Sequence, residues 1–293
     1  MTKLADHHSN TLVKVLCIGD AKSGKTGSLT SLVKAGYKLR ILDMDNLLDI
    51  LKYLVQRECP NLIGNVEYRT LRDKRRATSQ GMVIDGSPTA FIDAVKMLAH
   101  WTYRDIDGSE IDLECPADWG PDCILVIDSL SRLCDASYDW CEMRAPRGRS
   151  GDYDGRAVYG DAQDAVESML AGLTSRTFKT NVIVIAHIQY MDLPEGGKKG
   201  FPQGVGQKLS PKIPQYFPTV LHYSNKAGKR IIKTTSTPLI DLANPAPHLI
   251  DAEYPMESGL ASIFRILQST PIEEEPTPAQ PKIITPIKTI RRA

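Results

Sequence analysis

The sequence predicts an α/β fold with a mostly parallel central sheet, and two observations lead to that prediction. First, four apolar runs bounded by turn residues have the composition of buried parallel strands, at residues 12–19, 39–45, 123–129 and 181–187. Second, patterns typical of helices occupy residues 25–35, 46–56, 88–100 and 160–175. Strands that alternate with helices favour a sheet built from parallel crossover units.

The remaining segments are expected to complete one domain over residues 12–270. Residues 219–224 and 230–236 are predicted to form an antiparallel hairpin after the last parallel strand. Residues 58–121 are interpreted as an insertion-like region with one helix and polar, acidic turns. Residues 1–11 precede the domain as an N-terminal arm. Residues 271–293 contain five prolines in 23 positions, which is typical of a flexible tail.

Composition narrows the classes of function. Lys and Arg number 36 against 35 Asp and Glu, a net charge of +1, so nucleic acid would have to bind at local basic patches. The apolar runs are too short to cross a membrane, and the first residues lack the apolar stretch of a signal peptide, so the expected location is cytoplasmic. The six cysteines form no CxxC pair and are expected to be reduced thiols, although Cys115 with Cys123, or Cys134 with Cys141, could hold a metal together with a histidine.

Residues 19–26 have the pattern G-x-x-x-x-G-K-T between an expected strand and an expected helix. The backbone N–H groups of such a loop can turn inward and form a cradle for phosphates. Lys25 would add a charge at the β- and γ-phosphates, and Thr26 would offer its hydroxyl to Mg²⁺. A chance glycine-rich turn is disfavoured by the flanking elements. The expected nucleotide-binding residues are Gly19, Asp20, Ala21, Lys22, Ser23, Gly24, Lys25, Thr26 and Gly27.

Asp128 follows four apolar residues at the end of another expected strand, where α/β folds bind their ligands. We expect it to hold Mg²⁺ together with Thr26. A role as the N-cap of a helix from Leu130 onward is compatible with this function. Many ATPases place a glutamate after this aspartate to activate water, but here Ser129 follows, so the base must lie elsewhere.

Asp43 and Asp45 end the strand at residues 39–45, and a carboxylate there can accept a proton from the attacking water. One of them is expected to cap the helix at residues 46–56, and Asp45 is preferred as the base. His187 and Gln189 follow the strand at residues 181–187, and His187 is expected to contact the γ-phosphate. A histidine satisfied by backbone groups is the alternative.

These segments resemble a known family. The family is the RecA-like recombinases, whose core has four motifs that this chain matches in order. The phosphate loop resembles GDAKSGKT, and the D-x-E strand end resembles ILDMDNLLD. The metal-binding strand resembles CILVIDSLSRL, and the strand-end sensor resembles VIVIAHIQY. Within that core, residues 12–267 are most similar to the phage-encoded RecA-like ATPases of the Sak type, which are associated with single-strand annealing. The resemblance implies a RecA-like P-loop NTPase fold, ATP and Mg²⁺ as cofactors, and a homo-oligomer in the form of a ring or filament. It also implies that Lys25, Asp45 and His187 are catalytic. Asp45 stands where the family has Glu, and His187 stands where bacterial RecA has Gln.

The resemblance further implies that the segments after the third and fourth motif strands bind single-stranded DNA. Residues 144–160 contain Arg144, Arg147 and Arg149 among glycines and tyrosines. Residues 192–212 contain Lys198, Lys199 and Phe201. Cations can pair with phosphates, and rings can stack on bases without reading sequence. Long solvated loops are the alternative for both segments.

The sequence leaves open which cation completes the nucleotide site and which class of P-loop protein this is. RecA-like sites are usually completed by a cation from the next subunit, and the expected hairpin offers four candidates, although an ordinary exposed turn is as compatible: Lys226, Lys229, Arg230 and Lys233. A hexameric DNA motor, helicase or loader would share the same core, and a small-molecule kinase would share the phosphate loop. A kinase would need a short arginine-bearing lid and an acceptor pocket, and it is disfavoured by Asp128-Ser129 at the strand end and by the two long loops at RecA-like positions.

Overall fold

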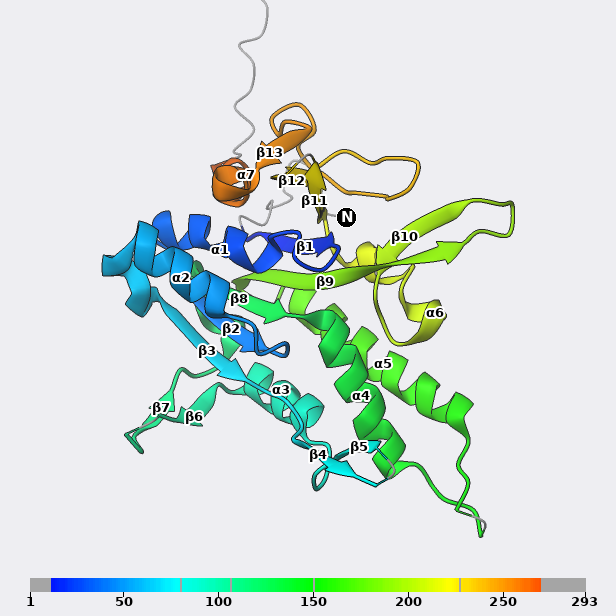
Figure 1. Cartoon of the computed structure of the whole chain (residues 1–293). Helices are drawn as coiled ribbons and strands as arrows, with labels where there is room; N and C mark the ends of the chain where they lie inside the picture. The colour runs from blue at the N-terminus through cyan, green and yellow to red at the C-terminus, as the bar shows by residue number, and fades with distance from the viewer. Residues whose placement is uncertain (1–11, 80, 106, 150, 227, 270–293) are drawn as a thin grey trace, which may run out of the picture.

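Figure 1 shows a computed structural model that describes residues 12–79, 81–105, 107–149, 151–226 and 228–269. Within these residues the centre is a nine-stranded sheet, in which β11, β1, β9, β8, β2 and β3 are parallel to one another. The order across the sheet is β13 (Glu253–Pro255), β12 (Lys229–Lys233), β11 (Thr219–Lys226), β1 (Lys14–Gly19), β9 (Thr180–Asp192), β8 (Gly120–Asp128), β2 (Lys38–Asp43) and β3 (Val66–Thr70), with β10 (Lys198–Pro202) paired to the end of β9. The predicted α/β class with a mostly parallel sheet is confirmed.

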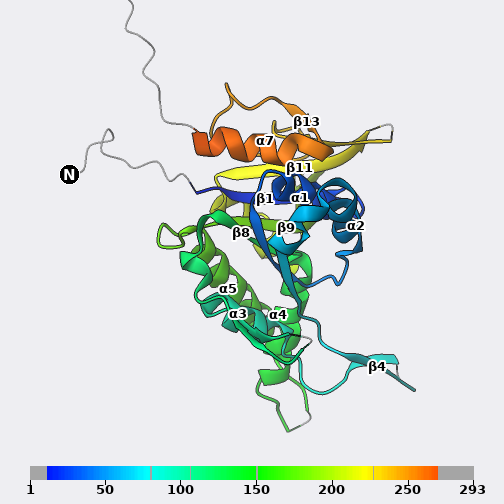
Figure 2. The same cartoon turned by 90° about the vertical axis from the view of Figure 1, so that its left-hand side faces the viewer.

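Helices cover both faces of this sheet (Figure 2). One face carries α1 (Lys25–Lys34), α2 (Asp49–Glu58) and α7 (Met256–Ser269), and the other carries α3 (Ala90–Ala99), α4 (Leu130–Arg144) and α5 (Gly155–Thr174). Alternate residues of each strand enter the two cores: Leu125 and Ile127 of β8 face the α4 side, whereas Ile124 and Val126 face the α1 side. This alternation explains why the central strands are apolar throughout, since both of their faces are buried.

The four predicted parallel strands correspond to β1, β2, β8 and β9, but some element boundaries differ. β2 ends at Asp43 rather than residue 45, and α2 begins at Asp49 rather than residue 46. The chain turns between them, with Asn46 at a φ of 56°. Asparagine tolerates this left-handed conformation, so the acidic segment forms a tight turn instead of an early helix. β9 runs on to Asp192, past the predicted end at His187.

The insertion-like interpretation of residues 58–121 overlooks an element of the main sheet. β3 lies in this region and pairs in parallel with β2 as an edge strand. Its residues are only partly buried, so their sequence lacks the apolar run that marks the central strands. The rest of the region holds α3 and two small hairpins, β4 (Arg75–Thr78) with β5 (Gly81–Ile84) and β6 (Thr102–Arg104) with β7 (Glu110–Asp112).

The predicted C-terminal hairpin is present as β11 and β12, which pair antiparallel and extend the sheet next to β1. β13 and α7 follow, and the sequence patterns did not predict either of them. α7 packs on α1, where the backbone N–H of Ala261 donates to Ser31 Oγ at 3.3 Å. The expected arm at residues 1–11 and the expected tail at residues 271–293 lie outside the described residues. No helix in the described part of the chain has the length and apolar character needed to cross a membrane.

Candidate nucleotide site

The phosphate loop joins β1 to α1, as predicted, and two of its glycines are required by close packing. A Cβ atom at Gly19 would lie 2.5 Å from the carbonyl oxygen of Tyr223. Gly24 is the N-cap of α1 with a φ of 102°, and a Cβ there would lie 2.3 Å from Met256 Sδ. Only glycine fits at both places. The loop therefore keeps its backbone N–H groups at the start of α1, where the helix dipole favours an anion.

Lys25 lies across this loop. Its Nζ donates to the carbonyl oxygens of Gly19 and Asp20, both at 2.8 Å, and lies 3.4 Å from Ser23 Oγ. Burial lowers the pKa of Lys25, while nearby Asp128 acts in the opposite direction. The ammonium group is thus held at the mouth of the cradle, ready to exchange carbonyl partners for phosphate oxygens.

Thr26 and Asp128 meet beside the loop. The hydroxyl of Thr26 donates to Asp128 Oδ2 at 2.7 Å, and Asp128, at the end of β8, is only 4% exposed. Burial raises the pKa of Asp128 to about 6. A hydroxyl and a carboxylate side by side are hard oxygen donors, which suit Mg²⁺. The alternative role of Asp128 as an N-cap is wrong, because Ser129 accepts the N–H of Arg132 and caps α4 itself.

The two aspartates of the β2 end have different surroundings. Asp43 is 2% exposed, and its oxygens accept from the backbone N–H of Asn46 at 2.7 Å and from Thr70 Oγ1 at 2.8 Å. It stabilises the turn before α2, although the N-cap of that helix is Leu48. Asp45 instead lines the cavity above the phosphate loop, as expected of the base.

The imidazole of His187 and the guanidinium of Arg132 lie next to the Asp45 carboxylate. Its Oδ2 lies 3.7 Å from His187 Nε2, and its Oδ1 lies 3.5 Å from Arg132 Nε. Burial alone would raise the pKa of Asp45, but the contacts with His187, Ser129 and Arg132 lower it below its ordinary value. These contacts favour the ionised form of Asp45 and hold its carboxylate from two sides, an arrangement that suits a general base.

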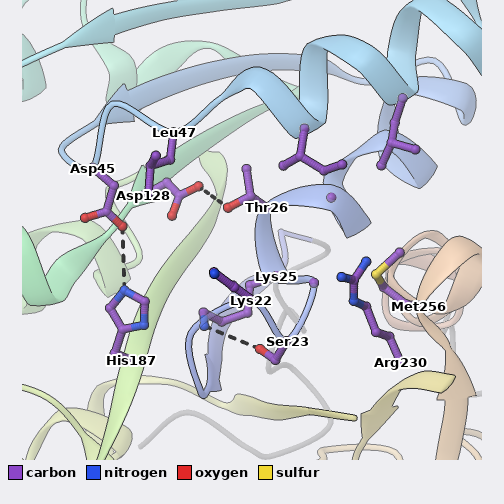
Figure 3. Close-up of a pocket in the computed structure, with 14 residues that line it drawn as sticks. Lys22, Ser23, Lys25, Thr26, Asp45, Leu47, Asp128, His187, Arg230 and Met256 are labelled. Atoms are coloured by element: carbon purple, nitrogen blue, oxygen red, sulfur yellow. Dashed lines mark hydrogen bonds and ion pairs between the residues drawn. The ribbon is translucent and has the colours of Figure 1, made fainter. Parts of the chain in front are cut away.

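His187 stands on β9 beside Gly19 of the loop strand, and its side chain points to Asp45 (Figure 3). Its backbone N–H donates to Ser131 Oγ at 3.0 Å. Gln189 does not line this cavity; it donates to Ser210 Oγ at 2.5 Å and so fixes the chain after β10. Of the two polar groups predicted at this strand end, the structure brings only His187 to the loop.

Sequence reasoning missed the other end of the cavity. Leu47, Ile50 and Leu54, from α2 and the turn before it, line it together with Met256 at the start of α7. Arg230 lines it too, from β12 of the same chain, whereas the sequence offered the hairpin cations either as candidates for a neighbouring subunit's site or as an ordinary exposed turn. Lys226, Lys229 and Lys233 are not among the lining residues. Nothing in the local sequence signals this contact, because about 200 residues separate Arg230 from the phosphate loop.

The second expected DNA segment is a hairpin rather than one long loop. Within residues 192–212, β10 pairs antiparallel with β9, and a four-residue helix, α6 (Gly206–Leu209), follows. Lys198 is exposed, but Lys199 Nζ lies 2.5 Å from Asp241 Oδ2. Phe201 is half-buried opposite Gln189. The paired part of the hairpin begins after His187, and the hairpin projects from the sheet (Figure 1).

The first expected DNA segment lies elsewhere. Arg144 ends α4 and stacks on Trp140 at 4.9 Å, and Arg147 stacks on Tyr153 at 4.9 Å; both arginines are exposed, as is Arg149. α4 has 15 residues, so its end lies about 20 Å from the strand end at Asp128. Figure 1 shows the α4–α5 connection well apart from the β9–β10 hairpin. Residues 155–160 of the expected loop belong to α5, and DNA binding by Arg144, Arg147 and Arg149 stays a prediction.

The six cysteines are free, and the described residues contain no group of three or more His, Cys, Asp or Glu side chains that could hold a metal. Burial raises the pKa of Cys17 to about 12, and it also raises that of Cys134. Both thiols are thus protonated core residues.

Comparison with known proteins gives a family match. A family model described as an AAA domain matches residues 11–244. No curated protein matches the chain. Similar solved structures include the RadB recombinase, at 15% identity and a TM-score of 0.42, over 84% of this chain and 89% of that one. They also include a prototypical ATPase from the type III secretion system of pathogenic bacteria, at 10% identity and a TM-score of 0.39, over 72% of this chain and 52%, about half, of that one.

Proposed function

The chain belongs to the AAA domain family of P-loop ATPases, and from this premise we propose that it is a Mg²⁺-dependent ATPase that acts on single-stranded DNA in annealing or recombination. The observation that carries the ATPase part is one cavity in which Lys25, the Thr26–Asp128 pair and Asp45 surround the phosphate loop. The DNA part rests on the exposed Lys198 of the β9–β10 hairpin, on the exposed arginines of the α4–α5 connection and on the sequence resemblance to Sak-type ATPases.

The polar residues around the phosphate loop each have a role in the proposed ATP hydrolysis. The N–H groups at the start of α1 and the ammonium of Lys25 bind the β- and γ-phosphates. Thr26 and Asp128 would hold Mg²⁺, which would supply positive charge beside the phosphates. Asp45 orients the attacking water and accepts its proton, and His187 keeps the Asp45 carboxylate in place. Asp45 is one methylene shorter than glutamate, so it needs this support to point at the water.

The hairpin offers a direct route from nucleotide to DNA. β9 carries His187 at the cavity and continues without interruption to Asp192, and Lys198 follows after the turn. A change at the γ-phosphate that moves His187 therefore moves the hairpin with it. The arginines of the α4–α5 connection supply a second basic segment, distant from the first. Two separate contacts on one chain suit a homo-oligomer that tracks a strand, as a ring or a filament.

The test is a titration of labelled single strands at several salt concentrations, with and without ATP, followed by annealing of complementary strands. Affinity should fall steeply with salt and show little sequence preference. Lys198→Ala should lower the slope of log K against log salt by roughly 0.7–1, and Phe201→Ala should weaken binding with little change in slope. Lys96→Ala, an exposed lysine on α3, is the matched control and should change neither.

Three outcomes contradict parts of this proposal. Binding without annealing would indicate a motor or loader. An unchanged affinity in the Lys198 and Phe201 variants would remove the hairpin from the DNA site. Absence of DNA binding at every salt concentration would leave an ATPase without nucleic acid and favour a small-molecule kinase.

A further inference from the structure

The cavity above the phosphate loop has two chemically different ends (Figure 3). Asp45 and His187 lie on one side of Lys25, and Arg230 and Met256 lie on the other. Water attack and metal binding need the acidic end, so the terminal phosphate of a nucleotide points there. The nucleoside then extends towards Arg230 and Met256, since the loop holds the phosphates between the two ends.

Packing around the loop glycines defines the walls of this second end. A Cβ built on Gly27 would lie 3.3 Å from Leu54 Cδ1 and 3.8 Å from Ile50 Cγ1, so α2 forms one wall. A Cβ built on Gly24 would lie 2.9 Å from Arg230 Cδ, so β12 and the start of α7 form the other. Both walls belong to the same chain and flank the first turn of α1.

We propose that the base of the bound nucleotide lies between Ile50 and Leu54 on one side and Arg230 and Met256 on the other, with the guanidinium of Arg230 against the base. This inference rests on the proposed nucleotide binding and adds how the nucleoside is recognised. The side chain of Arg230 is exposed and has no ion pair or hydrogen bond with another described residue, so its guanidinium is available to a ligand. A planar guanidinium stacks well on a flat aromatic ring.

The chemistry of these walls also limits selectivity. Among the described residues that line this end, Ile50, Leu54 and Met256 carry no hydrogen-bonding side chain, and Arg230 offers donors only. Strong discrimination between bases requires buried polar groups that the wrong base leaves unpaired. The slot therefore accepts a purine by shape and stacking, and ATP and GTP should bind with affinities within about tenfold of each other.

Calorimetric titrations of the full chain with ATP, ADP, GTP and tripolyphosphate test the inference. Arg230→Ala should weaken ATP, ADP and GTP by the same factor, about 3- to 30-fold, and leave tripolyphosphate unchanged because it has no base. The kcat at saturating ATP should stay within about twofold of the wild type. Lys229→Ala removes one cation from the same hairpin outside the cavity and should behave as the wild type.

The contradicting outcomes are separable. Loss of ATP affinity with ADP unchanged would place Arg230 at the γ-phosphate, and equal loss for tripolyphosphate would place it on the phosphates generally; either overturns the base contact. ATP binding more than 100-fold tighter than GTP overturns the stacking-only recognition. A wild-type chain that binds none of these ligands overturns the proposed function itself, whereas normal wild-type binding with an unchanged Arg230→Ala variant overturns this inference alone.

A mixing experiment tests whether Arg230 serves its own chain. Lys25→Ala subunits keep Arg230, and Arg230→Ala subunits keep an intact phosphate loop. If Arg230 acted on a neighbour, mixed assemblies would regain affinity and turnover at low ATP. We expect the mixture to show only the average of the two variants measured separately, and any recovery above that average overturns the same-chain assignment.

Discussion

The two ends of the nucleotide cavity are built differently. At the phosphate end the Asp128 residue is 4% exposed and the side chain of Asp45 is 12% exposed, and hydrogen bonds or ion pairs link them to Thr26, His187 and Arg132. At the nucleoside end Ile50 is 43% exposed and Arg230 is also exposed. The phosphate end is thus preorganised for chemistry, whereas the nucleoside end presents surface that a ligand covers. Substitutions at the first end should change turnover, and those at the second should change affinity.

Lys25 lies between the two ends, so its removal should have the largest effect on ATP affinity. Lys25→Ala should weaken ATP binding about 30-fold or more while leaving the fold intact, because a buried charge contact to phosphate is lost. Calorimetry measures the affinity, and circular dichroism checks the fold. ATP binding equal to the wild type would contradict the assignment of the loop.

Asp45→Asn should lower kcat by about 10²- to 10⁴-fold and leave the Kd for ATP within about threefold of the wild type, because the amide accepts no proton. Single-turnover hydrolysis with a parallel binding titration separates the two quantities. Asp43→Asn is the matched control on the same strand end, and its kcat should stay close to that of the wild type.

The Asp43→Asn variant should instead be less stable than the wild type. Asp43 accepts two hydrogen bonds while buried, and the amide of Asp43→Asn keeps only one acceptor oxygen, so the free energy of unfolding should fall by about 1 kcal/mol. Burial raises the pKa of Asp43, so loss of its charge offsets part of the cost of the lost hydrogen bond. Denaturant unfolding measures this quantity. If Asp43→Asn abolished hydrolysis and Asp45→Asn did not, the base would be Asp43.

Asp128→Asn should raise the Mg²⁺ concentration needed for turnover by about tenfold or more, because a charged oxygen ligand is lost.

The Asp128→Asn substitution should also stabilise the metal-free protein. The folded pKa of Asp128 is about 6, against an ordinary value of 3.8, so ionisation opposes folding from about pH 4 upward and reaches its full cost above pH 6. The gain at pH 7 should be about 1–3 kcal/mol and should shrink at pH 4. Thermal unfolding in a chelator at both pH values measures it, and destabilisation at pH 7 would be contradictory.

The smallest effect is expected at the nucleoside end. Ile50→Ala should weaken ATP binding about two- to fivefold without changing kcat, since a half-exposed side chain contributes only part of its apolar area. Tyr53→Ala, on the same helix but not lining the cavity, is the control and should change neither value. A larger fall in kcat than in affinity would show that the two ends are not separable.

Local sequence patterns were sufficient for the phosphate end. The spacing of Gly19, Gly24 and Lys25 defines a loop whose conformation depends on neighbouring residues, and the apolar run before Asp128 predicts a strand that ends at the sheet edge. Parallel strands bring their carboxyl ends together, so the meeting of the loop, Asp45, Asp128 and His187 at one edge could be anticipated from the pattern alone.

Tertiary structure decided the rest, because the deciding contacts join residues far apart in the chain. The sequence preferred Asp45 to Asp43 as the base, but the contacts that distinguish them are tertiary: Thr70 binds the buried Asp43, and His187 binds the candidate base Asp45. Residues 192–212 read as a flexible basic loop until β10 pairs with β9 and Asp241 binds Lys199. Arg230 lines the nucleotide cavity of the same chain only because β11 and β12 extend the sheet beside β1. Periodicity and motif spacing report interactions within a few residues, whereas these contacts depend on how distant segments pack, which no local pattern records.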